Sequence, residues 1–209
     1  MPTVTPWLAE VLDGGADDVD PTTERILDAC YTELLTYGVR RLSIEDVARR
    51  AGMARITIYR RFANKPALVR AVILREGRRL LSDVDAAVAG VPAGPEQIVE
   101  GFVTVLRLVR NHPLLQRMLT TEPDLALPFV TTHAAPVVAL ARDYLAIRLR
   151  RAAKSSHLKV RDPQEVAELL VRLTLSFLLT PESCIPLHSD ADARAFVRRH
   201  VLSSLAPPA

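Results

Sequence analysis

Apolar residues along the chain recur at the spacing of helices, and no stretch shows the alternation of a half-buried strand. In residues 21–38 they fall three and four positions apart, which places them on one helix face, and later segments repeat this pattern. Leu, Val, Ala and Arg are abundant, whereas aromatic residues make up only 5% of the 209 residues, and this balance favours helices over strands. With no heptad run and no internal repeat, the sequence predicts an all-α fold.

Helix start and stop signals divide the chain. Asp20 followed by Pro21 predicts a helix start. The Asp20 side chain can accept a free backbone N–H of the first turn, and the missing N–H of Pro21 has no cost at the first helical position. Gly38 predicts the end of that helix, since glycine tolerates the left-handed conformation found there. The expected helices cover 21–38, 44–51, 55–62, 64–89, 96–111, 132–155, 162–180 and 190–205, with a short segment over 114–121 and a proline-punctuated stretch before residue 132.

Charge is distributed unevenly along the chain, whose formal net charge is +3. Residues 20–80 hold thirteen Lys and Arg against seven Asp and Glu, a local balance of +6, whereas residues 81–209 are nearly neutral. A concentrated basic segment favours a local surface for a polyanion, although a solvated arginine-rich helix face has the same composition. Residues 1–19 hold four acidic and no basic residues, and are expected to form a disordered acidic arm.

Several classes of protein lack their signals in this sequence. Two cysteines, Cys30 and Cys184, exclude a disulfide scaffold, and the scattered histidines show no metal-ligand spacing, so no metal or cofactor is expected. The start has no signal-peptide pattern, and the apolar run 169–180 is shorter than the roughly 18–20 residues that span a bilayer. We therefore expect a cytoplasmic protein without a membrane partner. A helical enzyme remains an alternative, although no nucleophile–base motif or glycine-rich phosphate loop is present.

Residues 44–62 contain two short helices joined by a connection of three residues. Ser43 and Asp46 fit the S-x-x-[DE] helix start, in which the hydroxyl caps a free N–H and the acid favours the positive helix end. Gly52 ends this helix, and the next begins at Arg55. Two helices joined so tightly, the second carrying Arg and Thr, form a helix-turn-helix pattern.

The spacing within this pattern is more specific than a bare helix-turn-helix. It combines Ala51-Gly52 in the turn, Thr57-Ile58-Tyr59 in the second helix, Phe62 three residues after the tyrosine, and Lys65 three further on. In this combination the chain resembles the TetR family of bacterial transcriptional regulators, most strongly over residues 22–70. The resemblance implies an N-terminal three-helix helix-turn-helix domain followed by a larger helical ligand-binding and dimerisation domain.

Three positions depart from the family pattern. Ala54 stands where many members have a serine cap, and its methyl group cannot accept a backbone hydrogen bond. Ile56 stands where a small residue is common, and Arg61 where an aromatic residue is. These departures leave the resemblance intact but prevent the transfer of any known operator sequence.

The resemblance implies that the second helix reads bases in the major groove. The residues expected to contact DNA are Ser43, Arg55, Ile56, Thr57, Tyr59, Arg60, Arg61 and Lys65. Arg55 can bind guanine through two parallel hydrogen bonds, and Ile56 can contact a thymine methyl group. Ser43, Tyr59 and Lys65 resemble the family's phosphate contacts, which set the register on the duplex.

These positions also have purely structural interpretations. Ser43 could be only a helix cap, and Tyr59 could be an ordinary half-buried aromatic residue. One of Arg60 and Arg61 is expected to miss the bases. Ile58 points inward and is expected in the core.

For the C-terminal half, the resemblance implies dimerisation mainly through the last two helices, here 162–180 and 190–205. The first of these is apolar nearly all round, as expected for a helix buried on two sides, although a central helix of a monomer has the same pattern. The expected dimer contacts are Leu170, Leu173, Phe177, Phe196 and His200. The candidate effector contacts are Phe102, Leu106, Met118, Phe129, His133 and Tyr144, for each of which ordinary core packing is the alternative.

The sequence therefore predicts a homodimeric transcriptional regulator that binds a double-stranded DNA operator. We expect a repressor that is released by a small-molecule effector of unknown identity. The predicted regions are the arm 1–19, the DNA-binding domain 20–68, the connecting helix 69–90, and the ligand-binding and dimerisation domain 91–209. The alternative is a helix-turn-helix protein without small-molecule control, such as an architectural or cell-division factor.

Overall fold

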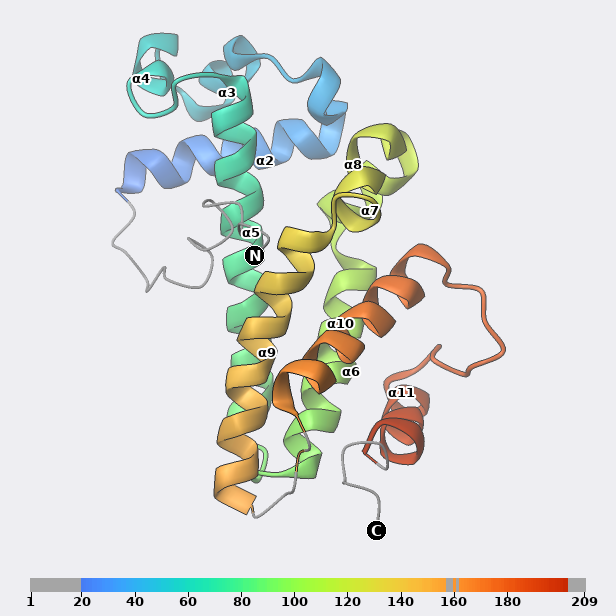
Figure 1. The fold of residues 1–209 in the computed structure, drawn as a ribbon. Helices are drawn as coiled ribbons and strands as arrows, with labels where there is room; N and C mark the ends of the chain where they lie inside the picture. Colours follow the sequence, from blue (N-terminus) through green and yellow to red (C-terminus); the bar gives the residue numbers. More distant parts are fainter. Residues whose placement is uncertain (1–19, 157–159, 161, 203–209) are drawn as a thin grey trace. The chain divides into compact units, whose positions relative to one another are not determined.

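The computed structural model describes residues 20–156, 160 and 162–202, and its regular elements over these ranges are all helical (Figure 1). This confirms the predicted all-α fold, while the predicted arm 1–19 lies outside the described residues. Within the same ranges, no single helix is long and apolar enough to span a membrane. In chain order the elements are α2 (Pro21–Arg41), α3 (Ile44–Ala51), α4 (Arg55–Tyr59), α5 (Lys65–Ala89), α6 (Pro95–Asn111), α7 (Pro113–Thr121), α8 (Pro123–Val130), α9 (Ala135–Ser156), α10 (Pro163–Leu179), α11 (Asp190–Phe196) and the π-helical turn η1 (Val197–Val201).

The helix starts follow the capping signals of the sequence. The Asp20 carboxylate accepts the N–H of Thr22 at 3.2 Å, and Asp162 accepts that of Gln164 at 2.8 Å. Gly38 interrupts α2 with a φ of 79° and a ψ of 176°, so the regular part of this helix ends there as predicted. These ends are therefore specified by local sequence.

Three elements differ from the prediction. The predicted helix 190–205 becomes π-helical over Val197–Val201, and residues 203–205 lie outside the described residues. The proline-punctuated stretch contains the helix α8, because Pro123 occupies its first turn, where the missing N–H has no intrahelical role. α4 ends at Tyr59 instead of residue 62, since the chain closes it with backbone bonds from Arg60 to Ile56 and from Arg61 to Ile58, both at 3.0 Å. The helix that follows the turn is thus only five residues long.

Contacts divide the described residues into two compact units. The helix-turn-helix unit comprises residues 20–79 and His112–Thr132, and the C-terminal unit comprises Leu80–Asn111 and residues 133–202. Helix α5 contributes to both units, and α7 and α8 belong with the helix-turn-helix despite their late place in the sequence. The packing units are therefore not the predicted regions 20–68 and 91–209, whose functional roles stay a prediction.

Each unit has its own apolar core. The core of the helix-turn-helix unit is built from α2, α3, α4 and α5, with Leu114 of α7 completing it. Cys30 lies in this core, where burial raises the pKa of its thiol to about 12, so it is an inert core residue at neutral pH. The core of the C-terminal unit is built from α6, α9, α10, α11 and η1.

His112 forms a titratable cap at the start of α7. Its Nδ1 accepts the N–H of Leu115 at 3.3 Å, and its Nε2 lies 3.8 Å from the Glu76 carboxylate. Burial lowers the pKa of His112 below 6.5, and the nearby charge of Glu76 opposes this shift only in part. The folded chain thus favours neutral His112, the form whose Nδ1 can cap the helix.

This cap predicts a loss of stability in acid. As the pH falls, His112 becomes protonated near pH 6.5 in the unfolded chain but only at a lower pH in the folded chain. The free energy of unfolding therefore decreases as the pH falls from 6.5 toward the pKa of the folded state. The His112→Asn variant keeps a capping side chain that does not titrate, and should lose this part of the pH dependence. Urea unfolding at about pH 7.5 and about pH 5.5 measures the difference. Equal pH dependence in both proteins would contradict the prediction.

Candidate nucleic-acid interface

The connection between α3 and α4 is a tight turn held by backbone bonds. Gly52 adopts the left-handed conformation, with φ 65° and ψ 40°, and its N–H donates to the carbonyl of Arg49 at 3.2 Å. The guanidinium of Arg25 on α2 donates to the carbonyl of Ala51 at 2.8 Å. The end of α3 is thereby fixed, and with it the direction in which α4 leaves.

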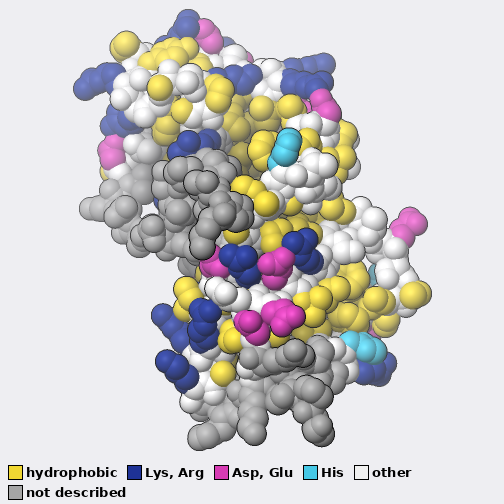
Figure 2. Space-filling model, viewed as in Figure 1, with side chains coloured by type: hydrophobic (Ala, Val, Ile, Leu, Met, Phe, Trp, Pro, Cys, Tyr) yellow, Lys and Arg dark blue, Asp and Glu magenta, His cyan; other side chains and the backbone are white. Residues whose placement is uncertain are grey.

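Helix α4 presents one buried and one exposed face. Ile58 is fully buried, whereas the side chains of Ile56 and Tyr59 are 66% and 42% exposed. Arg55 and Arg60 are exposed as well. Figure 2 shows Lys and Arg side chains gathered around the part of the molecule that contains α3 and α4. The exposed face therefore combines cations, which can bind guanine edges, with an apolar group that can contact a thymine methyl group, and with an aromatic group.

The three arginines of this region have different surroundings. Arg55 pairs with Glu45 of α3, with 2.6 Å between Nη1 and Oε1, and more than half of each side chain is exposed. Arg61 turns back to the start of α2, where its Nε donates to Asp20 at 3.1 Å and to Thr23 at 3.0 Å, and its hydrogen bond holds the pKa of Asp20 below the usual value. Arg60 is exposed and forms no ion pair within the described ranges. Of Arg60 and Arg61, the structure thus engages Arg61 within its own unit.

Two of the predicted phosphate contacts lie at helix N-termini. The Ser43 hydroxyl caps α3 by accepting the N–H of Asp46 at 3.1 Å, and it donates to the Asp46 carboxylate at 2.6 Å. Lys65 begins α5, and its Nζ donates to the carbonyl of Arg40 at 3.1 Å. Thr57 lies half-buried on α4 between these positions in the sequence. Helix N-termini favour anions through their free N–H groups and the helix dipole. The first turn of α3 already carries Glu45 and Asp46, so phosphate binding by Ser43 and Lys65 stays a prediction.

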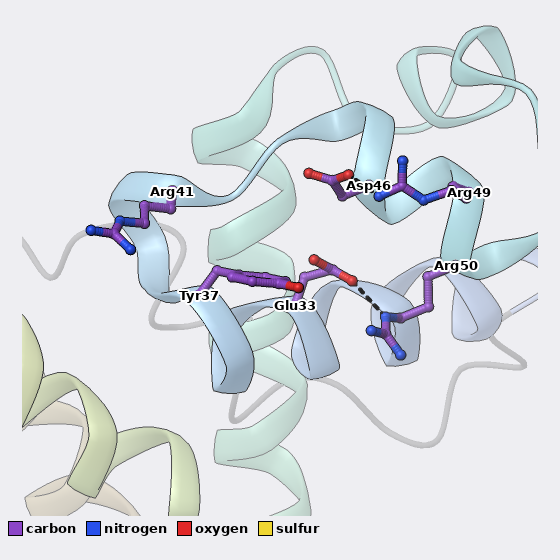
Figure 3. A pocket seen from close by; sticks show the side chains of 6 residues that line it. All are labelled: Glu33, Tyr37, Arg41, Asp46, Arg49 and Arg50. Carbon is purple, nitrogen blue, oxygen red and sulfur yellow. Dashed lines mark hydrogen bonds and ion pairs between the residues drawn. The ribbon is translucent and has the colours of Figure 1, made fainter.

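A polar groove of about 620 Å³ lies between α2 and α3 and was not predicted (Figure 3). It is lined by Glu33, Tyr37, Arg41, Asp46, Arg49 and Arg50. Arg50 donates to the buried Glu33 at 2.6 Å, and Arg49 pairs with Asp46. Arg41 extends away from these acidic side chains in Figure 3. The spacing of Glu33 and Tyr37, four residues apart on the regular part of α2, was a sequence signal for part of this face, whereas Arg41 follows the interruption at Gly38.

The predicted effector contacts do not gather around one cavity. Phe102 and Leu106 are buried in the core of the C-terminal unit, whereas Met118 packs against the core of the helix-turn-helix unit. Phe129 and His133 are exposed. Tyr144 is also fixed elsewhere: its hydroxyl donates to Asp85 of α5 at 2.9 Å, and the Arg148 guanidinium stacks 3.4 Å from its ring centre. A role for these six residues in effector binding stays a prediction.

The predicted dimer contacts divide into buried and accessible residues. Leu170 and Phe177 lie in the core of their own chain, where the rings of Phe177 and Phe196 meet edge to face at 5.8 Å. Leu173 is half-buried, and Leu169 beside it in the sequence is exposed. An apolar groove of about 640 Å³ beside η1 is lined by Cys184, Ile185, Pro186, Asp192, Ala195, Phe196, Arg199 and His200. Part of the predicted set is therefore accessible to a partner, together with residues that the prediction did not include.

Two family models match the chain. One, described as bacterial regulatory proteins of the tetR family, matches residues 26–72, and the other, described as the C-terminal domain of the bacterial tetracyclin repressor, matches residues 95–198. The first covers the helix-turn-helix and the start of α5. The second covers α6 to α11 and the start of η1.

The chain is also similar to individual regulators. It is 32% identical over 163 residues to the HTH-type transcriptional regulator AlkX of Mycobacterium tuberculosis, an overlap of 76% of this chain and 75% of that one. The crystal structure of the TetR family repressor AlkX from Dietzia sp., implicated in biodegradation of n-alkanes, superposes with a TM-score of 0.61 at 23% identity, covering 92% of this chain and 97% of that one. A complex of SmeT with triclosan superposes with a TM-score of 0.61 at 20% identity, covering 91% and 99%; SmeT is a repressor from Stenotrophomonas maltophilia.

Proposed function

The chain belongs to the TetR family of bacterial transcriptional regulators, and on this basis we propose that it is a homodimeric repressor that a small-molecule effector releases from its DNA operator. The observation that carries the proposal is the exposed face of α4, with Arg55, Ile56, Tyr59 and Arg60, on the helix that lies between α3 and α5 in the sequence. This arrangement offers base-reading and phosphate-binding groups on one short segment of chain.

Base reading falls to the first turns of α4. Arg55 would leave Glu45 for a guanine edge, an exchange favoured because the exposed pair contributes little in water. Ile56 is exposed enough to contact a thymine methyl group, and Arg60 is available for a base or a phosphate. Ser43, Tyr59 and Lys65 would bind phosphates and set the register.

The short length of α4 supports a dimer. A helix of five residues covers only a half-site, so recognition of a longer operator needs two copies related by a two-fold axis. We assign the dimer contact to α10 and the apolar groove beside η1, where Leu169, Leu173, Phe196 and His200 are accessible in whole or in part. In this model Leu170 supports the interface from within its own core.

Effector control would act through the distance between the α4 helices of the two chains. A ligand in the C-terminal unit would shift α5, which contributes to both units, and so move the two α4 helices away from half-sites one DNA turn (about 34 Å) apart. Triclosan in the SmeT complex supports a lipophilic effector. Triclosan and a long-chain n-alkane are therefore the first probes for release from DNA.

Selection of bound fragments from random DNA, with sizing of the complex, tests the regulator. We expect a two-fold symmetric site bound by two chains, and the absence of any enriched sequence would overturn the proposal. Enrichment without release by any apolar probe would favour a helix-turn-helix protein that lacks small-molecule control.

Two substitutions separate base reading from phosphate binding. Arg55→Ala should weaken binding to the selected site by about 1–3 kcal/mol and leave binding to mixed-sequence DNA nearly unchanged. Lys65→Ala should weaken both and lower the salt slope by about 0.9 per lost phosphate contact. Fluorescence anisotropy at several salt concentrations measures these effects. Arg150→Ala removes the same charge from an exposed position on α9, outside the proposed dimer contact, and controls for net charge. Equal losses on both DNAs for Arg55→Ala would exclude its base-reading role.

A further inference from the structure

A buried carboxylate from the connection between α7 and α8 holds the turn that follows α2. Glu122 is only 7% exposed, and it lies 82 and 83 positions along the chain from the two backbone groups that it binds. Its Oε2 accepts the N–H of Val39 at 2.7 Å, and its Oε1 accepts the N–H of Arg40 at 2.9 Å. Hydrogen bonds from backbone N–H groups to a carboxylate are short and roughly twice as strong as neutral ones.

Gly38 makes room for this carboxylate. Its φ of 79° with a ψ of 176° is a conformation that is essentially restricted to glycine. A Cβ at this position would lie 2.7 Å from Oε2 of Glu122 and 2.8 Å from its Cδ, inside van der Waals contact. The two residues are therefore matched in conformation and in shape, and together with the N–H groups of Val39 and Arg40 they form the Glu122 clamp.

The position of Glu122 is itself fixed by α7. Leu114 of this helix completes the core of the helix-turn-helix unit, and Arg117 donates from Nε to the carbonyl of Leu34 on α2 at 3.1 Å. Figure 1 shows α7 and α8 near the end of α2. The carboxylate is thus carried by a helix that is anchored both in the core and on the backbone of α2.

The backbone held by the clamp leads directly to two predicted phosphate contacts. The carbonyl of Arg40, whose N–H binds Glu122, accepts the Nζ of Lys65 at 3.1 Å. The N–H of Leu42 donates to the carbonyl of Gly38 at 3.2 Å, and the next residue is Ser43, the cap of α3. The N–H that binds Glu122 and the carbonyl that binds Lys65 therefore belong to the same residue, Arg40.

We propose that Glu122 is a positioning residue for DNA binding: by fixing the backbone of Val39 and Arg40, it holds the Arg40 carbonyl that orients Lys65 toward phosphate. The inference rests on the proposed function and assigns to it a residue outside the helix-turn-helix sequence. In Glu122→Gln the amide oxygen can accept only one of the two N–H groups, so the other N–H of a partly buried turn faces a donor and loses its acceptor, and the turn must move to find another.

Glu122→Gln and Asp124→Asn form a matched pair of variants. Both replace a carboxylate by an amide of the same size, but among the described residues Asp124 pairs with the exposed side chain of Arg40 and with no buried group. Binding is measured to a fluorescent mixed-sequence duplex over a series of salt concentrations. The slope of log K against log salt is negative, and we expect Glu122→Gln to make it less steep by about 0.9 per lost phosphate contact. Asp124→Asn should leave the slope unchanged. In the Lys65→Ala background, Glu122→Gln should cause no further decrease.

An unchanged slope in Glu122→Gln, or a decrease that adds to that of Lys65→Ala, would overturn the inference. Amide exchange in the wild-type chain is an independent measurement that does not need the variant to fold. The N–H groups of Val39 and Arg40 should exchange slowly, and fast exchange of both would also overturn it. Failure of the wild-type chain to bind any duplex would overturn the proposed function, whereas normal wild-type binding with an unaffected Glu122→Gln overturns this inference alone.

Discussion

Replacing Ile58 by alanine is expected to lower the free energy of unfolding by about 2–5 kcal/mol and to abolish sequence-specific DNA binding. Ile58 is fully buried, and it is the buried residue of a five-residue helix whose cap position, Ala54, makes no side-chain hydrogen bond. So short a helix has little stability of its own, and its place in the fold depends on tertiary packing. A cavity at this position would therefore detach α4 from the core, and with it the exposed face that is proposed to contact DNA.

Ile56→Ala is the matched control for the effect on stability, because it makes the same chemical change on the exposed face of α4. Its effect on stability should stay within about 0.5 kcal/mol, as is usual for surface substitutions. Urea unfolding followed by circular dichroism gives the free energies of both variants, and binding to the selected DNA site gives the functional loss. Equal destabilisation by the two substitutions would show that α4 is not anchored through Ile58.

Arg75→Ala is expected to lower the free energy of unfolding by about 2–3 kcal/mol, less than for a fully buried ion pair, because its acidic partners are partly solvated. The Arg75 side chain is only 8% exposed and joins α5 to α2. Its Nη1 lies 2.7 Å from Asp28 and 3.2 Å from Glu24, and its Nε lies 3.2 Å from Glu76 on its own helix. Removing the cation leaves Glu76 in a largely buried position with weaker compensation.

Arg79, one turn further along α5, provides an internal comparison. It faces the same three acidic residues at 3.1–3.8 Å, but its side chain is 51% exposed. Solvent screens such a pair, so Arg79→Ala should cost less than about 1 kcal/mol. The difference between the two variants in urea unfolding measures the effect of burial on one set of charges. A larger loss for Arg79→Ala than for Arg75→Ala would contradict the assignment of Arg75 as the main link between α5 and α2.

The parts of the fold that sequence could predict are those specified locally. The cap at Ser43, the left-handed turn at Gly52 and the inward position of Ile58 each depend on residues within a few positions, and the structure has all three. Helix α8 escaped prediction because a proline inside a helix start looks the same as a proline in a loop. Similarity to the TetR family supplied the order of domains, which periodicity alone does not give.

The parts that sequence could not predict depend on contacts between distant segments. The pairing of Arg61 with Asp20 joins residues 41 positions apart, and no local sequence pattern predicts it; a contact of Arg61 with DNA stays a prediction. The assignment of α7 and α8 to the helix-turn-helix unit depends on Leu114 and Glu122, whose partners lie in α2 and in the turn that follows it. The effector residues were chosen by type, and core packing accounts equally well for apolar side chains such as Phe102.

The interleaving of the two packing units limits how this protein can exchange parts with its relatives. A hybrid joined in the connection between α5 and α6 would carry the helix-turn-helix but not Leu114 or Glu122, leaving a gap in the core and two backbone donors without acceptors. A hybrid that also transplants residues 112–132 keeps α7 and α8 together with the helix-turn-helix, whose core and turn they complete. Recombination between regulators of this kind should therefore keep α7 and α8 together with α2, α3, α4 and the part of α5 up to Arg79.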